Sequence, residues 1–262
     1  MRWKNRVIQG NNVEILSQLP EDLFDMVFTS PPYDNLREYK GIPEFSYTDL
    51  GKEIYRTLKP GGVCCWVQQD GTIEGRKTCS SFRTCLDFVD NAGLNLWETV
   101  IYSRLGAPGY KDRFRLSHEY IFIFMKGAKP KTFNEEALRA EPNLNRKAQS
   151  FTRRYPDGNF KVHTYVGAKM KKLTTVMQYN ASSKDSRREK LAHPATFPDE
   201  LAKDFIQLFS NPDELVLDPF NGSGTTCYMA KKLGRQYTGI ECAKEYVELS
   251  ERLLKSCQTG LL

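Results

Sequence analysis

The stretch Leu215-Val216-Leu217-Asp218-Pro219-Phe220-Asn221-Gly222-Ser223-Gly224-Thr225-Thr226 decides the fold of this 262-residue chain. Its first three residues are apolar, as in a buried strand, and residues 225–233 predict a helix. Glycines at such a junction let the backbone approach a ligand closely, and the first N–H groups of the helix point towards that ligand. The stretch therefore predicts a strand, a ligand-binding turn and a helix.

The rest of the chain also alternates between short apolar runs and amphipathic segments. We expect strands at residues 6–10, 24–30, 63–67, 96–102, 119–125, 215–217 and 237–240, and helices at residues 13–19, 47–58, 80–92, 198–209, 225–233 and 245–254. Apolar strands that alternate with helices are typical of a parallel sheet covered on both faces. The sequence therefore predicts an α/β fold with a doubly wound, mostly parallel sheet.

The glycine turn has the features of a nucleoside site without a phosphate chain. A Walker loop needs a Lys before Ser or Thr, which residues 224–226 lack, and Cys227 stands where the dinucleotide fingerprint needs its third glycine. The next strand ends at Glu241, a position from which a carboxylate accepts hydrogen bonds from both ribose hydroxyls. S-adenosylmethionine is the commonest ligand of this kind, and a tight turn without a ligand is the alternative.

A second motif, Ser30-Pro31-Pro32-Tyr33, follows the expected strand at residues 24–28. Each proline fixes φ and lacks an N–H group, and the residue before a proline is held extended. The stiff backbone presents the Ser30 hydroxyl, the Pro31 carbonyl and the Tyr33 ring. By itself, the motif is also compatible with a plain loop at the end of a strand.

The positive charge of the chain is concentrated in one segment. The net charge is +6, but residues 126–190 hold 16 Lys and Arg against 6 Asp and Glu, and the remainder has a net charge of −4. Aromatic residues are interleaved with these charges, and the segment has little helical or strand periodicity. Such a segment is either a solvated insertion or a surface that binds a polyanion.

Together, residues 30–33 and 218–226 resemble the DNA amino-methyltransferases, which methylate adenine N6 or cytosine N4. The catalytic motif comes first and the cofactor motif lies near the C-terminus, which is similar to the circularly permuted β class. The resemblance covers about residues 6–126 and 190–254, including His193-Pro194-Ala195-Thr196-Phe197-Pro198. It implies a Rossmann-like catalytic domain in two parts, residues 1–126 and 191–262, around a basic target-recognition insertion at residues 127–190.

The resemblance implies transfer of a methyl group from S-adenosyl-L-methionine to the exocyclic amine of a base flipped out of DNA. Because Ser at the first motif position is found more often in cytosine-N4 enzymes, we expect cytosine N4, with adenine N6 as the alternative. An RNA or protein amide methyltransferase is a more remote alternative. The glutamine methylases keep the cofactor motif upstream of their catalytic motif, and the opposite order in this chain argues against them. A catalytically idle DNA-binding module is the hypothesis from another class.

The candidate site residues fall into three groups, of which the resemblance implies the catalytic and cofactor-binding ones and the basic charge pattern indicates the DNA-binding one. The catalytic group contains Ser30, Pro31, Pro32 and Tyr33. The cofactor-binding group contains Asn11, Asp218, Phe220, Asn221, Gly222, Ser223, Gly224, Thr225 and Glu241. The DNA-binding group contains Lys111, Arg113, Arg115, Arg146, Lys147, Arg153, Arg154, Lys169, Lys171 and Lys172. Asn11 departs from the family, which usually has an acid at this position.

Composition restricts the remaining classes. Seven cysteines without a Cys-x-x-Cys pair predict reduced core residues and no zinc site, and we expect no metal. Apolar stretches such as residues 120–125 are far shorter than the ~20 residues of a membrane span, and residues 1–6 lack the apolar core of a signal peptide. We therefore expect a cytoplasmic protein without a membrane partner. Double-stranded DNA is the expected partner, while a homodimer and a cognate restriction enzyme stay open.

Overall fold

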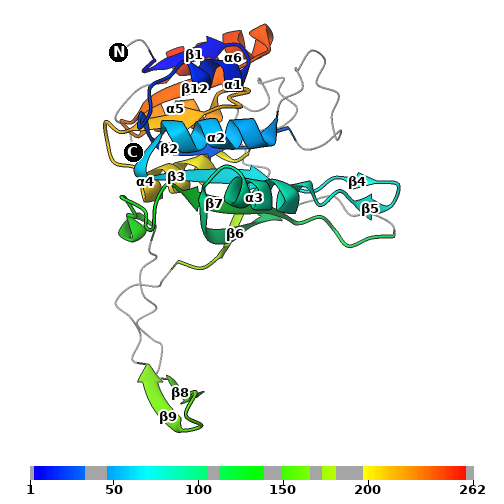
Figure 1. Cartoon of the computed structure of the whole chain (residues 1–262), viewed down its shortest axis with the longest axis vertical. Coiled ribbons are helices and arrows are strands. Elements are labelled where there is room, and N and C mark those ends of the chain that lie inside the picture. The colour runs from blue at the N-terminus through cyan, green and yellow to red at the C-terminus, as the bar shows by residue number, and fades with distance from the viewer. Residues whose placement is uncertain are drawn as a thin grey trace. The chain divides into compact units, whose positions relative to one another are not determined.

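The computed structural model describes residues 3–32, 46–105, 112–138, 149–165, 173–180 and 197–257. The chain divides into two compact units, one of Met1–Asn134 with Thr175–Leu262 and the other of Glu135–Thr174. Figure 1 labels the helices and strands of both units. The second unit lies within the predicted insertion at residues 127–190, whose bounds as a target-recognition domain stay a prediction.

Eight strands of the described residues form one sheet in the first unit, in the order β1-β12-β11-β2-β3-β7-β6-β10. These strands are β1 (Arg6–Gln9), β2 (Phe24–Thr29), β3 (Leu58–Gln68), β6 (Asn95–Leu105), β7 (His118–Met125), β10 (Val176–Asn180), β11 (Leu215–Asp218) and β12 (Gln236–Glu241). Neighbouring strands are parallel except that β7 is antiparallel to both β3 and β6. The predicted α/β fold with a mostly parallel sheet is confirmed.

Helices cover both faces of this sheet. They are α1 (Asn12–Ser17), α2 (Tyr47–Thr57), α3 (Ser80–Asp90), α4 (Asp199–Phe209), α5 (Thr225–Lys232) and α6 (Lys244–Lys255). Helices α1, α2 and α3 pack side by side, and so do α4, α5 and α6; Figure 1 shows α2 running along β2 and β3. Trp66 contacts Phe88 of α3, whereas Phe28, which pairs with Cys65, contacts Phe205 of α4. Because side chains alternate along a strand, the two layers lie on opposite faces.

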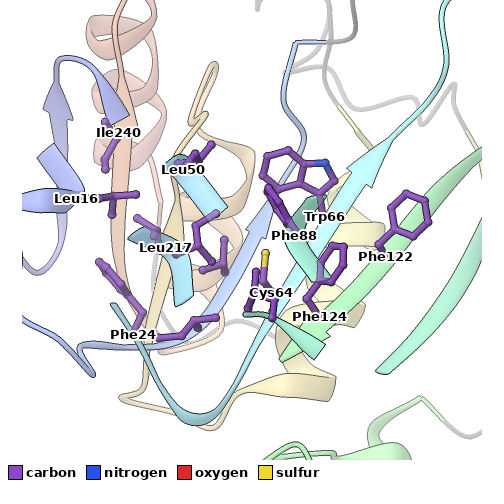
Figure 2. Packing of buried hydrophobic residues seen from close by; sticks show 14 of the residues in the cluster. Leu16, Phe24, Leu50, Cys64, Trp66, Phe88, Phe122, Phe124, Leu217 and Ile240 are labelled. Atoms are coloured by element: carbon purple, nitrogen blue, oxygen red, sulfur yellow. The ribbon is translucent and has the colours of Figure 1, made fainter. Parts of the chain in front are cut away.

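The main core lies between the sheet and the layer of α1, α2 and α3. Leu16, Leu50 and Phe88 from the three helices meet Trp66 and Leu217 of the sheet (Figure 2). Each fully buried side chain of this size contributes ~1.5–3 kcal/mol to folding. Since strands β11, β2 and β3 share this core, their carboxyl ends are held in a fixed arrangement.

Helix α2 shows how the sequence sets the element boundaries. Ser46 Oγ accepts a hydrogen bond from Asp49 N at 3.2 Å and caps the helix, while Leu50 and Ile54, four residues apart, face the core. The helix ends at Thr57, just before Pro60. The sequence predicts the next strand at residues 63–67, but β3 is longer and begins at Leu58.

Several short strands are absent from the sequence-based prediction. They are β4 (Thr72–Ile73) and β5 (Arg76–Lys77), which form a hairpin after β3, and β8 (Gln149–Arg154) and β9 (Phe160–Tyr165), which form a hairpin in the second unit. β10, which pairs with β6, was not predicted either. The second unit also contains the 3₁₀ turn η2 (Glu135–Ala137). None of the helices in the described ranges has the length and apolar character needed to cross a membrane.

The cysteines, all of which lie in described ranges, are free thiols. Five of them are buried: Cys64, Cys65, Cys85, Cys227 and Cys257. Cys242 is half-buried and Cys79 is exposed. The expectation of reduced core residues therefore holds for the five buried thiols and is wrong for Cys79, which precedes α3 on the surface.

Candidate active site

The predicted cofactor motif forms the turn between β11 and α5. Gly224 precedes the helix with φ +91°, and Gly222 has φ +48°. A side chain at Gly224 would place its Cβ 2.7 Å from the Cβ of Ser250 on α6. Glycine is therefore needed both for the backbone conformation and for the close packing of this turn. The first N–H groups of α5 have no partner within the helix and are available to a ligand at this edge of the sheet.

Asp218, the last residue of β11, joins the turn to β2. Its Oδ1 accepts hydrogen bonds from Thr29 Oγ1 at 2.7 Å and from Phe220 N at 3.0 Å. Burial raises the pKa of this carboxyl group from 3.8 to about 6, although the bonds from Thr29, Thr226 and Phe220 act in the opposite direction. The Asp218 side chain thus connects two strand ends that are 189 positions apart in the chain.

Glu241 ends β12, the strand next to β11. Its Oε2 accepts a hydrogen bond from Gly222 N at 2.8 Å, and its Oε1 accepts one from Ala243 N at 2.9 Å. A carboxylate offers about four lone-pair sites, so these two backbone bonds do not exhaust the capacity of this half-buried group. The acid that the sequence analysis selected therefore lies directly against the glycine turn.

The Ser-Pro-Pro motif follows β2 at the same edge of the sheet. β2 lies between β11 and β3 and is parallel to both, so the three strands end at one edge. Pro31 is buried, whereas Ser30 and Pro32 are half-buried. Tyr33 lies outside the described residues. The structure thus brings Ser30 and the glycine turn to the ends of neighbouring strands.

The start of α1 contacts the turn through Asn12 rather than through Asn11. Asn11 caps the helix, since its Oδ1 accepts hydrogen bonds from Val13 N at 2.9 Å and from Glu14 N at 3.3 Å. Asn12 Nδ2 donates a hydrogen bond to the carbonyl of Pro219 at 3.3 Å. Asn12 is not among the residues selected from the sequence, because a buried packing role was the simpler interpretation of it. The predicted contact of Asn11 with the cofactor stays a prediction.

The remaining predicted cofactor residues belong to the turn itself. Three of them are buried: Asn221, Ser223 and Thr225. Asn221 is 3% exposed, and neither its Nδ2 nor its Oδ1 has a hydrogen-bond partner among the described residues. It lies over Gly239, where a Cβ would be 2.5 Å from Asn221 Oδ1. The Phe220 ring is partly buried and contacts Trp66 edge-on, with 6.0 Å between ring centroids.

Three polar residues at the carboxyl end of β3 are not among those selected from the sequence. Gln68, Gln69 and Asp70 are all buried. Gln69 Nε2 donates to the carbonyl of His118, and Asp70 Oδ1 accepts a hydrogen bond from Ser81 N at 2.8 Å. Gln68 Nε2 has no partner in the described part of the chain. The available signal was a polar triplet directly after an apolar strand.

Two of the predicted DNA-contacting residues, Arg113 and Arg115, lie just before β7, which begins at the edge where β3 ends. Arg113 is exposed and donates a hydrogen bond to the carbonyl of Gly75 in the β4–β5 turn. Phe114 between the two arginines is 99% exposed, and the sequence analysis did not select it. Lys111 lies outside the described residues. This segment presents an aromatic ring between two cationic side chains.

Arg153 and Arg154, also predicted to contact DNA, belong to the β8–β9 hairpin of the second unit. The Arg153 guanidinium lies 5.7 Å from the ring centroid of Tyr155, with Lys161 Nζ 5.4 Å from the same ring. Arg154 lies 5.7 Å from the ring of Phe160. The remaining predicted DNA contacts fall outside the described residues: Arg146, Lys147, Lys169, Lys171 and Lys172. The hairpin therefore carries exposed cations beside aromatic rings.

Two further expectations concern residues near the site. Of the His-Pro stretch, residues 193–196 are outside the described ranges, and Phe197 contacts the Phe28 ring with 5.2 Å between centroids. Within the described ranges, no group of three or more His, Cys, Asp or Glu side chains is arranged to hold a metal ion.

This sheet, with a glycine turn and a proline motif at one edge, has the Rossmann-like architecture that the sequence predicts. A family model described as DNA methylase (N6_N4_Mtase) matches residues 24–252. The chain therefore belongs to the N6/N4 DNA methylase family.

Named relatives agree with this family, and a solved structure shows the same fold. The orphan methyltransferase M.BamHII of Bacillus amyloliquefaciens is 40% identical over 240 residues, which cover 88% of this chain and 89% of that protein. The type II methyltransferase M.HpaI of Haemophilus parainfluenzae is 30% identical over 263 residues, 96% of this chain and 74% of the relative. The solved PvuII DNA methyltransferase, described as cytosine-N4-specific, matches with a TM-score of 0.69 at 22% identity. The match covers 94% of this chain and 85% of the PvuII chain.

Proposed function

We propose that the chain transfers a methyl group from S-adenosylmethionine to the N4 amine of a cytosine in duplex DNA at a specific site. The observation that carries the proposal is the hydrogen bond of 2.7 Å between Thr29 Oγ1 and Asp218 Oδ1. It joins the residue before Ser30 to the first residue of the glycine turn. A group that binds the turn therefore lies beside the Ser-Pro-Pro motif.

The residues of the turn fit S-adenosylmethionine, which supplies a methyl group activated on a sulfonium when it is bound. The turn has no Lys for a phosphate chain, and Glu241 retains lone pairs for ribose hydroxyls. The buried amide of Asn221, within the same turn, has two polar atoms that find no partner among the described residues. We assign the ribose to Glu241, the adenine to Asn11, and the remaining length of the ligand to the turn. The turn residues are Asp218, Phe220, Asn221, Gly222, Ser223, Gly224 and Thr225.

The Ser-Pro-Pro motif supplies the chemistry at the amine. The lone pair of an exocyclic amine is delocalised into the base, so this nitrogen is a poor nucleophile. If Ser30 Oγ and the Pro31 carbonyl accept its two N–H bonds, they favour a pyramidal nitrogen whose lone pair faces the methyl group. They also stabilise the positive charge that develops on the nitrogen, as preorganised dipoles do. Fixed orientation of the two reactants contributes the rest of the rate.

Ser30 supports cytosine N4 as the target, because this residue type at the first motif position resembles the cytosine-specific members of the family. Adenine N6 is the second candidate, since both bases present an exocyclic amine next to a ring nitrogen. Either base must leave the duplex, which costs a few kcal/mol. Tyr33, by resemblance, stacks on the flipped base.

Exposed cationic side chains support duplex DNA as the partner. Arg113 and Arg153 are exposed on the first and second units, respectively. Lys and Arg that neutralise phosphates release counterions and so drive binding to DNA. The aromatic rings beside them offer faces on which bases stack.

The test is methyl transfer to DNA copied by a polymerase, which carries no modified bases. The purified protein is incubated with this DNA and with S-adenosylmethionine labelled in its methyl group. The nucleosides are then identified by mass spectrometry, and the modified positions are mapped by sequencing. We expect N4-methyldeoxycytidine at one short sequence. N6-methyldeoxyadenosine would contradict the base assignment, and label found only in RNA or protein would contradict the substrate.

A further inference from the structure

The carboxyl end of β3 holds a fully buried amide nitrogen without a hydrogen-bond partner in the described part of the chain. Gln68 is 0% exposed, and Nε2 finds no acceptor among the residues that the structure describes. The orientation of the amide follows from its neighbour. Trp66 Nε1, which can only donate, lies 2.7 Å from Gln68 Oε1. The amide oxygen therefore faces the indole, and both N–H bonds of Nε2 point elsewhere.

Gln68 lies beside the Ser-Pro-Pro motif. β2 and β3 are parallel neighbours, and Thr29, the last residue of β2, pairs with Trp66, two residues before Gln68. Neighbouring strands are ~4.8 Å apart, and side chains two residues apart in a strand point to the same face. The Gln68 amide is thus on the face of Trp66, at the strand adjacent to the motif; Figure 2 shows the Trp66 indole near the end of β3.

Aromatic rings surround this face of the strand ends. The Trp66 ring contacts the rings of Tyr47 and of Phe220 in the glycine turn, with 6.1 Å and 6.0 Å between ring centroids. Tyr120 pairs with Gln68 from the other side, in β7. Pockets for planar ligands combine aromatic or apolar walls with a few polar groups that fix the orientation. A buried N–H donor among these rings therefore matches a flat heterocycle that carries an acceptor.

We propose that Gln68 Nε2 donates a hydrogen bond to the ring nitrogen beside the exocyclic amine of the flipped base, which is N3 in cytosine and N1 in adenine. The inference rests on the proposed function, in which Ser30 and Pro31 accept the N–H bonds of that amine. The ring nitrogen loses its Watson–Crick partner when the base leaves the duplex. Pairing it with Gln68 satisfies two otherwise unpaired groups and fixes the rotation of the base within the site.

The first test is Gln68→Leu on a duplex oligonucleotide that carries the mapped site. Leu keeps the bulk of the side chain and removes the donor, so we expect kcat/KM for DNA to fall ~10- to 100-fold. The dissociation constant for S-adenosylmethionine, measured by calorimetry, should not change. Gln69→Leu is the matched control, because the Gln69 amide already donates to the His118 carbonyl. We expect it to retain the wild-type kcat/KM, and unfolding temperatures report the structural cost of both variants.

The second test removes the acceptor instead of the donor. In a modified duplex, the target base has a C–H in place of the ring nitrogen, as in 3-deazacytosine or 1-deazaadenine. The wild type should lose ~10- to 100-fold in kcat/KM on this duplex. Gln68→Leu should lose nothing further, because the effects of removing two groups that bond each other are not additive.

The outcomes separate the two proposals. A wild type that methylates the deaza duplex as well as the natural one overturns the role of Gln68, even where Gln68→Leu fails to fold. Equal deaza losses in the wild type and in Gln68→Leu also overturn it. A wild type that transfers no methyl group to natural DNA contradicts the proposed function itself.

Discussion

Glu241 Oε2 accepts a hydrogen bond of 2.8 Å from the backbone N–H of Gly222, so the acid at the end of β12 braces the turn at the end of β11. The same carboxylate accepts a second bond from Ala243 N at 2.9 Å. It therefore holds the backbone of the glycine turn and that of Ala243, the residue that precedes α6. A single side chain shapes the site and, in our proposal, also binds the ligand.

Glu241→Ala should weaken binding of S-adenosylmethionine ~10- to 100-fold, because hydrogen bonds to a charged group are worth ~1.5–3 kcal/mol. The measurement is isothermal titration calorimetry. Glu241→Gln keeps an oxygen that can accept the Gly222 bond, so its affinity should lie between that of the wild type and that of Ala. Wild-type affinity in the Ala variant would contradict the ribose assignment.

Ser30→Ala should lower kcat at least ~100-fold and leave the affinity for S-adenosylmethionine unchanged, since the hydroxyl acts on the amine during transfer. Single-turnover kinetics with labelled cofactor measure the chemical step directly. Ser17→Ala is the control, because Ser17 is an exposed residue of α1 whose hydroxyl bonds the Glu14 carbonyl. Equal rates in the wild type and in Ser30→Ala would remove Ser30 from the mechanism.

The alternation of strands and helices could be predicted because each long element has an apolar face and ends near a breaker. Pro60, for example, follows α2 closely, and Asp218-Pro219 ends β11. Strands β4 and β5 have two residues each and are exposed, so no periodicity marks them. β10 was missed because Val176–Asn180 lies in a charge-rich segment and pairs in parallel with the distant β6.

The predicted site residues of the turn do gather at one edge, but the bonds that hold them there do not follow from local sequence. The Thr29–Asp218 bond spans 189 positions, and no spacing rule indicates such a pair. The role of Asn11 could not be decided from the sequence, because the same residue type serves both as a helix cap and as a ligand contact. Gln68 could not be selected, since an unpaired buried amide is a property of the packed structure.

Asp218 should make stability depend on pH. Burial raises the pKa of its carboxyl group from 3.8 to about 6, so the folded state keeps a proton that the unfolded state releases. The stabilising contribution is complete below pH 3.8 and is lost as the pH rises through about 6. One pKa unit corresponds to ~1.4 kcal/mol, so the loss amounts to ~3 kcal/mol.

Asp218→Asn removes this titration and retains an oxygen for the bonds from Thr29 and Phe220. The unfolding free energy of the wild type minus that of Asp218→Asn, from urea titrations, should therefore fall between pH 4 and pH 7. Thr29→Val removes a donor that lowers the pKa of Asp218, so in that background the fall should extend to higher pH. A difference that is constant with pH would contradict the assigned shift.

Reversal of two charges on the β8–β9 hairpin tests whether the second unit binds DNA phosphates. Arg153 and Arg154 are exposed, and each phosphate contact contributes about −0.9 to the slope of log K against log salt concentration. The variant Arg153→Glu/Arg154→Glu should flatten that slope by about 2, as measured by fluorescence anisotropy at several salt concentrations. Lys244→Glu/Lys255→Glu changes the net charge equally at exposed positions of α6. Because phosphate contacts act locally, this control should keep the wild-type slope, and an equal flattening in both variants would assign the effect to net charge alone.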